Sequence, residues 1–182
     1  MKRTVWTFGL ISGAILSAMM LLTIPFEDSI GYDRGEIIGY TTMILSFLLI
    51  FFGVRSYRDN VGGGSIGFGR ALAVGSLITV ISCACYVVTW EVIYFKLAPD
   101  FMTKFQTYSV EKAKASGGSP EAIQKKIYDA QRFAKLYQNP AFNVAVTFVE
   151  PLPVGLVLTL VSAGILCRKR RRERAALAAS VG

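Results

Sequence analysis

The sequence predicts an all-α membrane protein with four transmembrane helices and an external, periplasmic helical hairpin between helices three and four. The 182-residue chain is 53% hydrophobic and only 18% charged, a balance typical of membrane proteins. Its apolar residues are gathered into four blocks long enough to cross about 30 Å of hydrocarbon, which takes about 20 helical residues. These blocks are roughly Thr4–Phe26, Ile37–Val54, Ala71–Leu97 and Phe142–Cys167.

The first block could instead be a cleaved secretory signal, since it follows Lys2 and Arg3. The apolar region of such a signal is about 7–15 residues long. This run continues to Phe26 and ends without a good cleavage site between small residues. We therefore expect a transmembrane helix.

A glycine-rich segment lies between the second and third blocks. It contains Gly62, Gly63, Gly64, Gly67 and Gly69. The spacing of three of them matches the dinucleotide-binding fingerprint, but no strand is expected before it, and Arg70-Ala71 stands where a phosphate-binding P-loop needs Lys-Ser/Thr. We expect a flexible cytoplasmic turn.

Segment 99–141, between the third and fourth blocks, predicts a helical hairpin. Aromatic residues share one face of its first helix, and Ser119-Pro120 starts the second helix with an N-cap and an N1 proline. The second helix carries an apolar stripe at Ile123, Ile127, Ala130, Ala134 and Tyr137. This face must be covered by the partner helix, by the membrane surface or by another protein. A self-contained cap over the bundle is the default expectation.

Charges beside the blocks predict the orientation in the membrane. An even number of spans places both termini on one side, and the basic run after the fourth block makes that side cytoplasmic by the positive-inside rule. The expected anchors to lipid headgroups are Lys2, Arg3, Arg55, Arg58, Arg70, Arg168, Lys169, Arg170, Arg171 and Arg172. Segment 99–141 does not follow this rule well. It would lie outside, yet it holds seven Lys or Arg against four Asp or Glu. Most of these lysines lie away from the span ends, where the rule applies most strongly.

Small residues recur at every fourth position in three of the blocks. The stripes start at Gly9, Ala71 and Gly155. Such stripes let helix backbones approach closely. Most pack within one chain, and they also permit oligomerisation.

The glycine-rich turn and the fourth block carry a family resemblance. The turn reads Gly63-Gly-Ser-Ile-Gly-Phe-Gly-Arg-Ala71, and the block runs from Pro153 through Gly155 to Ala163 before the basic tail. The layout resembles the DUF4199 family of bacterial integral membrane proteins, which is named for its unknown function. The resemblance covers roughly residues 1–172 and implies a bacterial inner-membrane protein, without catalytic residues to carry over. We expect one transmembrane domain at 1–172, including the hairpin, and a flexible cytoplasmic tail at 173–182.

The fourth block contains an acid and two prolines, Glu150, Pro151 and Pro153. Prolines lack an amide hydrogen, so the carbonyls of Thr147 and Val149 lose their helical partners and a break is expected. Glu150 lies 18 residues before Arg168, or about 27 Å along an ideal helix, near the outer headgroups.

A second acid, Glu91, is expected at a similar depth, about 31 Å from Arg70. One interpretation is structural: both acids reach water or pair with Lys96, Arg132 or Lys135 of the hairpin. The other is a transport or proton-relay role, because ionisable groups at membrane depth beside a broken helix are typical of transporters.

The remaining residue types indicate no enzyme. Cys83, Cys85 and Cys167 fall in or at the end of apolar blocks, and the chain has no histidine, so neither a metal site nor a His-assisted nucleophile is expected. We expect no catalytic residue and no cofactor. The predicted function is a non-enzymatic integral inner-membrane protein acting through contacts with lipids, with itself or with another membrane protein, and not with nucleic acid. The alternative is a small transporter or an ion or proton pathway component using Glu150 and Glu91.

Overall fold

The all-α prediction is confirmed. The computed structural model describes the backbone of residues 1–181 and the side chains of these residues except Glu27, Asp28 and 168–181. In the described part, 88% of the chain is helical and no strand occurs. The helices are α1 (Lys2–Thr23), α2 (Glu27–Ile30), α3 (Tyr32–Asn60), α4 (Phe68–Val92), α5 (Phe101–Ala115), α6 (Pro120–Tyr137), α7 (Pro140–Val149) and α8 (Leu152–Val181).

Four helical segments are long and apolar enough to cross a membrane. They are Lys2–Phe26, Tyr32–Asn60, Phe68–Leu97 and Pro140–Cys167. The second segment begins at Tyr32 rather than at the predicted Ile37, directly after Gly31, whose φ of 73° favours glycine. The third ends in a short π-helical turn, Ile93–Leu97.

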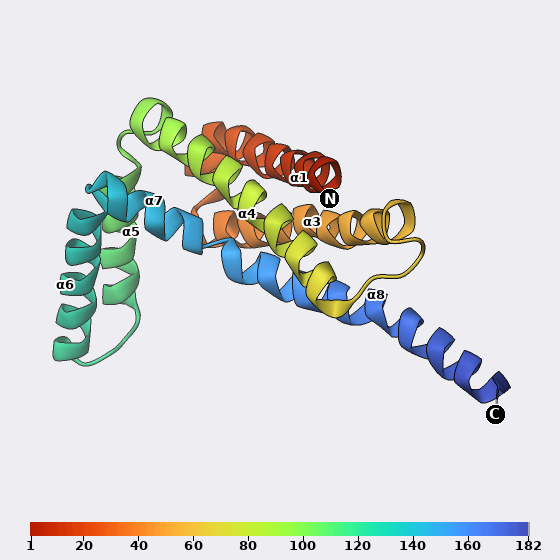
Figure 1. Ribbon diagram of the computed structural model, residues 1–182. Coiled ribbons are helices and arrows are strands. Elements are labelled where there is room, and N and C mark those ends of the chain that lie inside the picture. The colour runs from red at the N-terminus through yellow and green to blue at the C-terminus, as the bar shows by residue number, and fades with distance from the viewer. Residues whose placement is uncertain (182) are drawn as a thin grey trace.

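Helix α4 lies at the centre of the bundle, packed against α1, α3 and α8 (Figure 1). Both termini and the α3–α4 turn lie at one end of the bundle, and α5 and α6 lie at the other end. Helix α8 continues to Val181, through the segment predicted as a flexible tail. The side chains of the predicted anchors 168–172 lie outside the described residues.

The glycine-rich segment forms the turn between α3 and α4. The φ angles of Gly63 and Gly64 are 60° and 83°, which L side chains rarely adopt. The amide of Gly64 donates a hydrogen bond to the carbonyl oxygen of Arg58 at 3.0 Å, which closes the end of α3. These glycines therefore allow the chain to reverse direction between α3 and α4.

Helices α5 and α6 pack against each other as a hairpin where the sequence predicts one. The Oγ of Ser119 accepts a hydrogen bond from the amide of Ala122 at 3.3 Å, as expected for an N-cap. Along the predicted stripe, Ala134 and Tyr137 are buried and the other three residues are half-buried. In Figure 1 both helices run across the direction of the spans, with α5 nearer to the bundle than α6.

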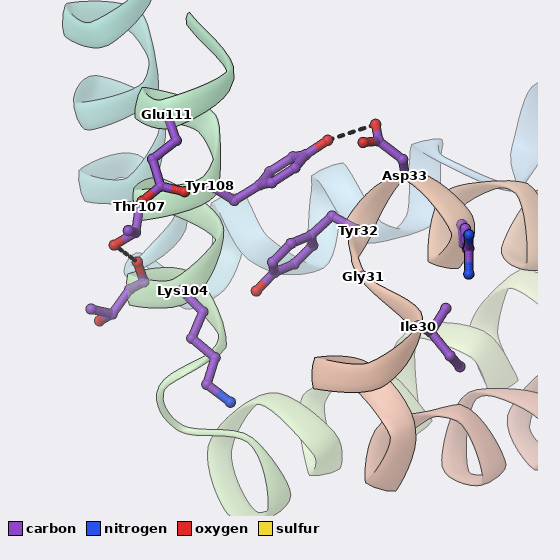
Figure 2. Close-up of a pocket in the computed structure, with 10 residues that line it drawn as sticks. Ile30, Gly31, Tyr32, Asp33, Lys104, Thr107, Tyr108 and Glu111 are labelled. Atoms are coloured by element: carbon purple, nitrogen blue, oxygen red, sulfur yellow. Dashed lines mark hydrogen bonds between the residues drawn. The ribbon is translucent and has the colours of Figure 1, made fainter. Parts of the chain in front are cut away.

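An aromatic cluster joins the hairpin to the bundle. The Tyr32 ring at the start of α3 lies 6.0 Å from Phe101, 5.7 Å from Phe105 and 4.8 Å from Tyr108, measured between ring centroids. Figure 2 shows the rings of Tyr32 and Tyr108 side by side. Trp90 of α4 packs edge-on against Phe101 at 4.8 Å. The aromatic face of α5 is thus covered by the end of the bundle.

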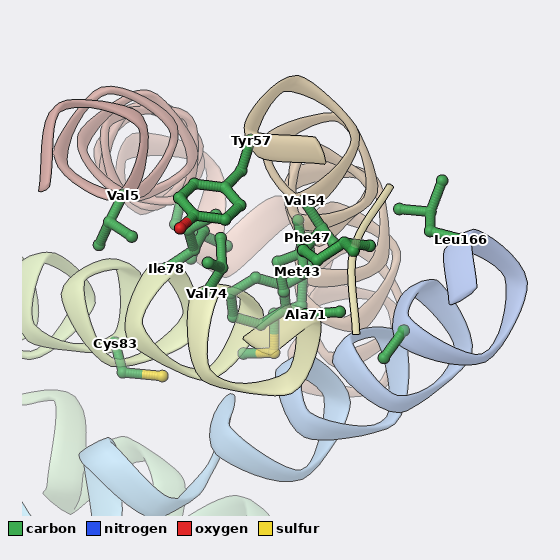
Figure 3. Packing of buried hydrophobic residues seen from close by; sticks show 14 of the residues in the cluster. Val5, Met43, Phe47, Val54, Tyr57, Ala71, Val74, Ile78, Cys83 and Leu166 are labelled. Atoms are coloured by element: carbon green, nitrogen blue, oxygen red, sulfur yellow. The ribbon is translucent and has the colours of Figure 1, made fainter. Parts of the chain in front are cut away.

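The main apolar core lies among α1, α3, α4 and α8 (Figure 3). Its buried side chains include Val5, Met43, Phe47, Val54, Val74, Ile78 and Leu166. Large apolar side chains also cover the outside of the spans. Trp6, Leu22, Ile37, Leu45 and Val88 are each more than half exposed, which suits contact with hydrocarbon.

Helices α4 and α8 cross at a reciprocal pair of small contacts. A Cβ on Gly75 would meet Cγ2 of Thr159 at 2.6 Å, and a Cβ on Gly155 would overlap Cγ2 of Thr79. The two threonine hydroxyl oxygens lie 3.3 Å apart, within hydrogen-bond distance. Two of the predicted small-residue stripes therefore pack on each other within the chain, as expected for helices in lipid.

The first stripe packs on the opposite side of α4. Gly9 lies against Ile81, and Gly13 lies against Cys85. The Ser82 hydroxyl of α4 donates to the carbonyl oxygen of Gly9 at 3.1 Å. Such a bond requires the backbones of α1 and α4 to approach closely, which the glycines permit.

We predict that Gly155→Ala destabilises the protein because its methyl group would overlap Thr79. Overpacking of this kind costs about 1–3 kcal/mol. The matched control is Gly164→Ala in the same helix, where a Cβ meets nothing within 4 Å and helix propensity favours alanine by about 1 kcal/mol. Thermal unfolding in detergent measures both, and equal effects would contradict the prediction.

Candidate functional site

The fourth span is interrupted at Glu150 and Pro151. Helix α7 ends at Val149 and α8 begins at Leu152, at the place where the prolines predict a break. Pro151 is fully buried, and its carbonyl oxygen accepts a hydrogen bond from the amide of Gly155 at 3.1 Å as α8 starts. Pro153 is exposed in the first turn of α8, where a missing amide hydrogen costs little.

The Glu150 carboxylate is held by α4 through a tyrosine. The Tyr86 hydroxyl, from a largely buried side chain, donates to Oε2 of Glu150 at 3.1 Å. Neither Glu150 nor Glu91 forms an ion pair with Lys96, Arg132 or Lys135 among the side chains that the structure describes. The partner of Glu150 is instead a tyrosine on the adjacent span.

A chain of hydrogen bonds joins α4, α6 and α7 at the same end of the bundle. Nε1 of Trp90 donates to the Tyr137 hydroxyl at 2.8 Å. The hydroxyl oxygens of Tyr137 and Thr147 are 3.1 Å apart. The Thr147 hydroxyl donates to Oδ1 of Asn143 at 3.2 Å.

The bonds of this chain all point in one direction. Thr147 has one hydroxyl hydrogen, which it gives to Asn143. The hydrogen between Tyr137 and Thr147 must then come from Tyr137, which in turn accepts from Trp90. The chain thus runs from the third span through the end of the hairpin into α7, and it fixes the position of the hairpin relative to both spans.

Two buried polar atoms at this end have no hydrogen-bond partner among the described residues. They are Nδ2 of Asn143, a donor, and Oε1 of Glu91, an acceptor. Both carboxylates act on the same hydroxyl: burial raises the pKa of Tyr137, and the negative charges of Glu150 and Glu91 add to the increase, although the hydrogen bonds with Thr147 and Trp90 lower it. The charges of both acids therefore act on Tyr137, which is itself bonded to Trp90 and Thr147.

Transport through this region is not favoured. Two hollows lie on the hairpin and at its junction with α3, and neither is lined by Glu150 or Glu91. The Glu150 carboxylate is bonded to Tyr86, and the neighbouring hydroxyl groups are bonded to one another. Across the described residues, no three side chains capable of binding a metal come together.

An ionic contact attaches the far part of α5 to the start of α3. Oδ1 of Asp33 accepts hydrogen bonds from the Tyr108 hydroxyl at 2.6 Å and from Nζ of Lys112 at 2.5 Å. Lys112 also donates to the Tyr108 oxygen at 2.7 Å. Figure 2 shows the bond between Tyr108 and Asp33. This contact lies beyond the aromatic cluster and is exposed to solvent.

The hydrogen bonds of several residues at this end were not predicted from the sequence. These residues are Asp33, Tyr86, Trp90, Lys112, Tyr137, Asn143 and Thr147. One signal was present: Asn143 and Thr147 are polar residues spaced by four within an apolar block, so they share a helix face. The other predicted anchors lie at the opposite end, where Lys2, Arg3, Arg55 and Arg70 are exposed and Arg58 is half-buried.

Comparison with known proteins identifies a family. The family model described as "Protein of unknown function (DUF4199)" matches residues 7–168. This match agrees with the resemblance noted from the glycine-rich turn and the fourth span. A search of curated proteins and a search of solved structures each found no match.

We predict that Tyr137→Phe destabilises the protein, because Trp90 loses its acceptor and Thr147 loses its donor. Leaving such buried groups unpaired costs about 1–3 kcal/mol. The control is Tyr128→Phe in the same helix, since Tyr128 is 60% exposed. Thermal unfolding in detergent should show a lower Tm for the first variant only. A Tyr137→Phe variant as stable as the control would contradict the proposed hydrogen-bond chain.

The ionic contact predicts a pH dependence. The hydrogen bond to Asp33, and then that to Tyr108, raise the pKa of Lys112. A raised pKa means that this contact contributes fully below the ordinary lysine pKa of about 10.4 and is lost as pH rises through the higher value. Hydrogen exchange of the α5 amides should therefore be faster in Lys112→Gln than in the parent at pH 8, and this difference should shrink above about pH 10.4.

The matched control for that experiment is Lys114→Gln, which removes an exposed lysine of the same helix. It should leave the exchange unchanged. Equal exchange in both variants at pH 8 would show that Asp33 does not hold the hairpin.

Proposed function

Since the chain belongs to the DUF4199 family, whose function is unknown, we propose that it is a non-enzymatic integral protein of the bacterial inner membrane that acts through contacts of its hairpin. The partners are membrane lipids, a second copy of the chain or another membrane protein, and nucleic acid is not among them. The observation that carries the proposal is the hairpin itself, which contacts one end of the bundle by one face and presents its other face outward.

The outward face of α6 has the composition of a contact surface. Opposite the buried stripe, Lys125, Tyr128, Arg132 and Leu136 follow one another at spacings of three and four. Tyr128 is 60% exposed and Leu136 is 43% exposed. Basic residues interleaved with exposed apolar residues suit anionic headgroups or the rim of a protein interface. None of these four side chains is needed to hold the hairpin on the bundle.

The polar residues at the hairpin end support a structural role rather than catalysis. The Tyr86 hydroxyl bonds the third span to Glu150 at the break in the fourth span. The Tyr137 hydroxyl bonds the end of the hairpin to Thr147 of α7, and the Thr147 hydroxyl donates to Asn143 within α7. The bonds of Tyr137 tie the hairpin to the spans. A protein that acts through contacts needs its outward surface to be held in place by the rest of the fold.

We propose that the hairpin is periplasmic and both termini are cytoplasmic. The supporting observation is that the termini and the α3–α4 turn share one end of the bundle (Figure 1), where Lys2, Arg3, Arg55 and Arg70 are exposed. The positive-inside rule favours the cytoplasm for such an end.

Cysteine labelling tests this orientation. Lys125→Cys on α6 should react with a membrane-impermeant maleimide in spheroplasts, and Ser65→Cys in the α3–α4 turn should react only after lysis. The parent chain reports any reaction of its own cysteines. The reverse pattern would overturn the orientation.

Photo-crosslinking tests the contact role. A photoreactive residue at position 128 should give adducts with phospholipid or with a defined membrane protein in native membranes. Arg132→Gln should reduce these adducts without lowering Tm, because Arg132 is exposed. Position 128 yielding neither kind of adduct would contradict the proposed role of this face.

A further inference from the structure

A groove lies between the hairpin and the start of the second span. It has a volume of about 580 Å³, within the range of about 300–1,000 Å³ for small-molecule sites. Residues 30–34 form one wall, and α5 forms the other through Thr103, Lys104, Thr107, Tyr108 and Glu111. Figure 2 shows Lys104 and Glu111 on α5, with the rings of Tyr32 and Tyr108 between them and the start of α3.

The groove carries charges of both signs. Asp33 is engaged by Lys112 and Tyr108, so its charge is balanced. The remaining charged side chains of the lining are Arg34, Lys104 and Glu111. Lys104 forms an ion pair with Asp100 at 3.2 Å. The lining thus offers cationic donors, with Arg34 on the α3 wall, and one further carboxylate on α5.

The acceptors are grouped on α5. Thr107 and Glu111 are spaced by four, so they share one face of the helix. The Thr107 hydroxyl donates its hydrogen to the carbonyl oxygen of Thr103 at 3.0 Å. Its oxygen can therefore act only as an acceptor toward a ligand, and Thr107 lines the groove together with Glu111. Two acceptors close together suit an ammonium group, whereas Arg34 suits a phosphate.

The groove also lies at the boundary between polar and apolar surface. Ile37 follows Arg34 by three residues on α3, so the two are neighbours on the helix surface. Ile37 is 67% exposed, and Phe26 at the end of the first span is 60% exposed. A molecule with its polar part in the groove would therefore have hydrocarbon-facing side chains directly next to it. This placement favours an amphiphile over a soluble ligand.

We propose that this groove binds the headgroup of a zwitterionic aminophospholipid. Arg34 holds the phosphodiester, and Glu111 with Thr107 holds the ammonium group. The acyl chains lie along the exposed apolar side chains next to the groove, Ile37 and Phe26. This inference rests on the proposed function, because it requires the hairpin to lie at the membrane surface, and it deepens that function by naming one lipid class and its site.

Native mass spectrometry of the purified full-length chain tests the proposal. Delipidated protein is titrated with dimyristoyl phosphatidylethanolamine and with dimyristoyl phosphatidylglycerol, which has the same phosphodiester without the ammonium group. The parent should bind the ethanolamine lipid about tenfold more tightly, as one charge-assisted hydrogen bond provides. Glu111→Gln should remove this preference, and Arg34→Gln should weaken the binding of both lipids.

The matched control is Lys114→Gln, which removes an exposed cation of α5 outside the groove lining and should change neither titration. Each variant's Tm is compared with that of the parent. If Arg34→Gln lowers Tm, Arg34→Lys replaces it, and binding should still weaken because the forked guanidinium is lost.

Three outcomes would overturn the proposal. The first is equal or tighter binding of phosphatidylglycerol by the parent chain. The second is a preference that survives Glu111→Gln. The third is displacement of the lipid by free phosphoethanolamine, which would identify a soluble ligand in place of a lipid. Different results would contradict the proposed function. They are the reverse pattern of cysteine labelling, or the absence of any crosslinked adduct from position 128.

Discussion

The close crossing of α4 with α8 and α1 is the constraint on which the rest of the structure depends. Helices in lipid gain little from burying apolar surface against one another, so their association relies on close backbone approach. Gly75 and Gly155 each accept a threonine methyl from the facing helix, and the Gly9 carbonyl receives a serine hydroxyl from α4. Once α4 is fixed in this way, Tyr86 and Trp90 are fixed with it, and these two residues organise the hairpin end.

The break at Pro151 makes the polar end of the bundle possible. An unbroken helix would carry α7 on along the axis of α8. With the interruption, α7 is a separate helix in which Asn143 and Thr147 are buried and Thr147 lies within hydrogen-bond distance of Tyr137. The prolines therefore divide the fourth span into two parts that pack differently. Helix α8 packs against α4 through small residues, and α7 packs against α4 and the hairpin through hydrogen bonds.

Elements set by local patterns could be predicted from the sequence, and contacts between elements could not. Hydropathy located the four spans, Ser119-Pro120 located the start of α6, and the missing amide hydrogens at Pro151 and Pro153 located the break. Tyr86 could not be predicted as the partner of Glu150, because the rotation of α4 about its axis decides which of its side chains faces the fourth span. The pairing of Asp33 with Lys112 likewise depends on how the hairpin is tilted, which no short stretch of sequence encodes.

The hairpin is held unevenly along its length. Its base is buried in the cluster of Met102, Ala134 and Tyr137 with Trp90 and Phe142, whereas Asp33 holds the distal part of α5 by an exposed ionic contact. Exposed ion pairs are weak, and buried aromatic contacts are strong. The base of the hairpin is therefore held more firmly than its distal part, so loss of the Asp33 contact would loosen the distal end first while the spans kept their packing.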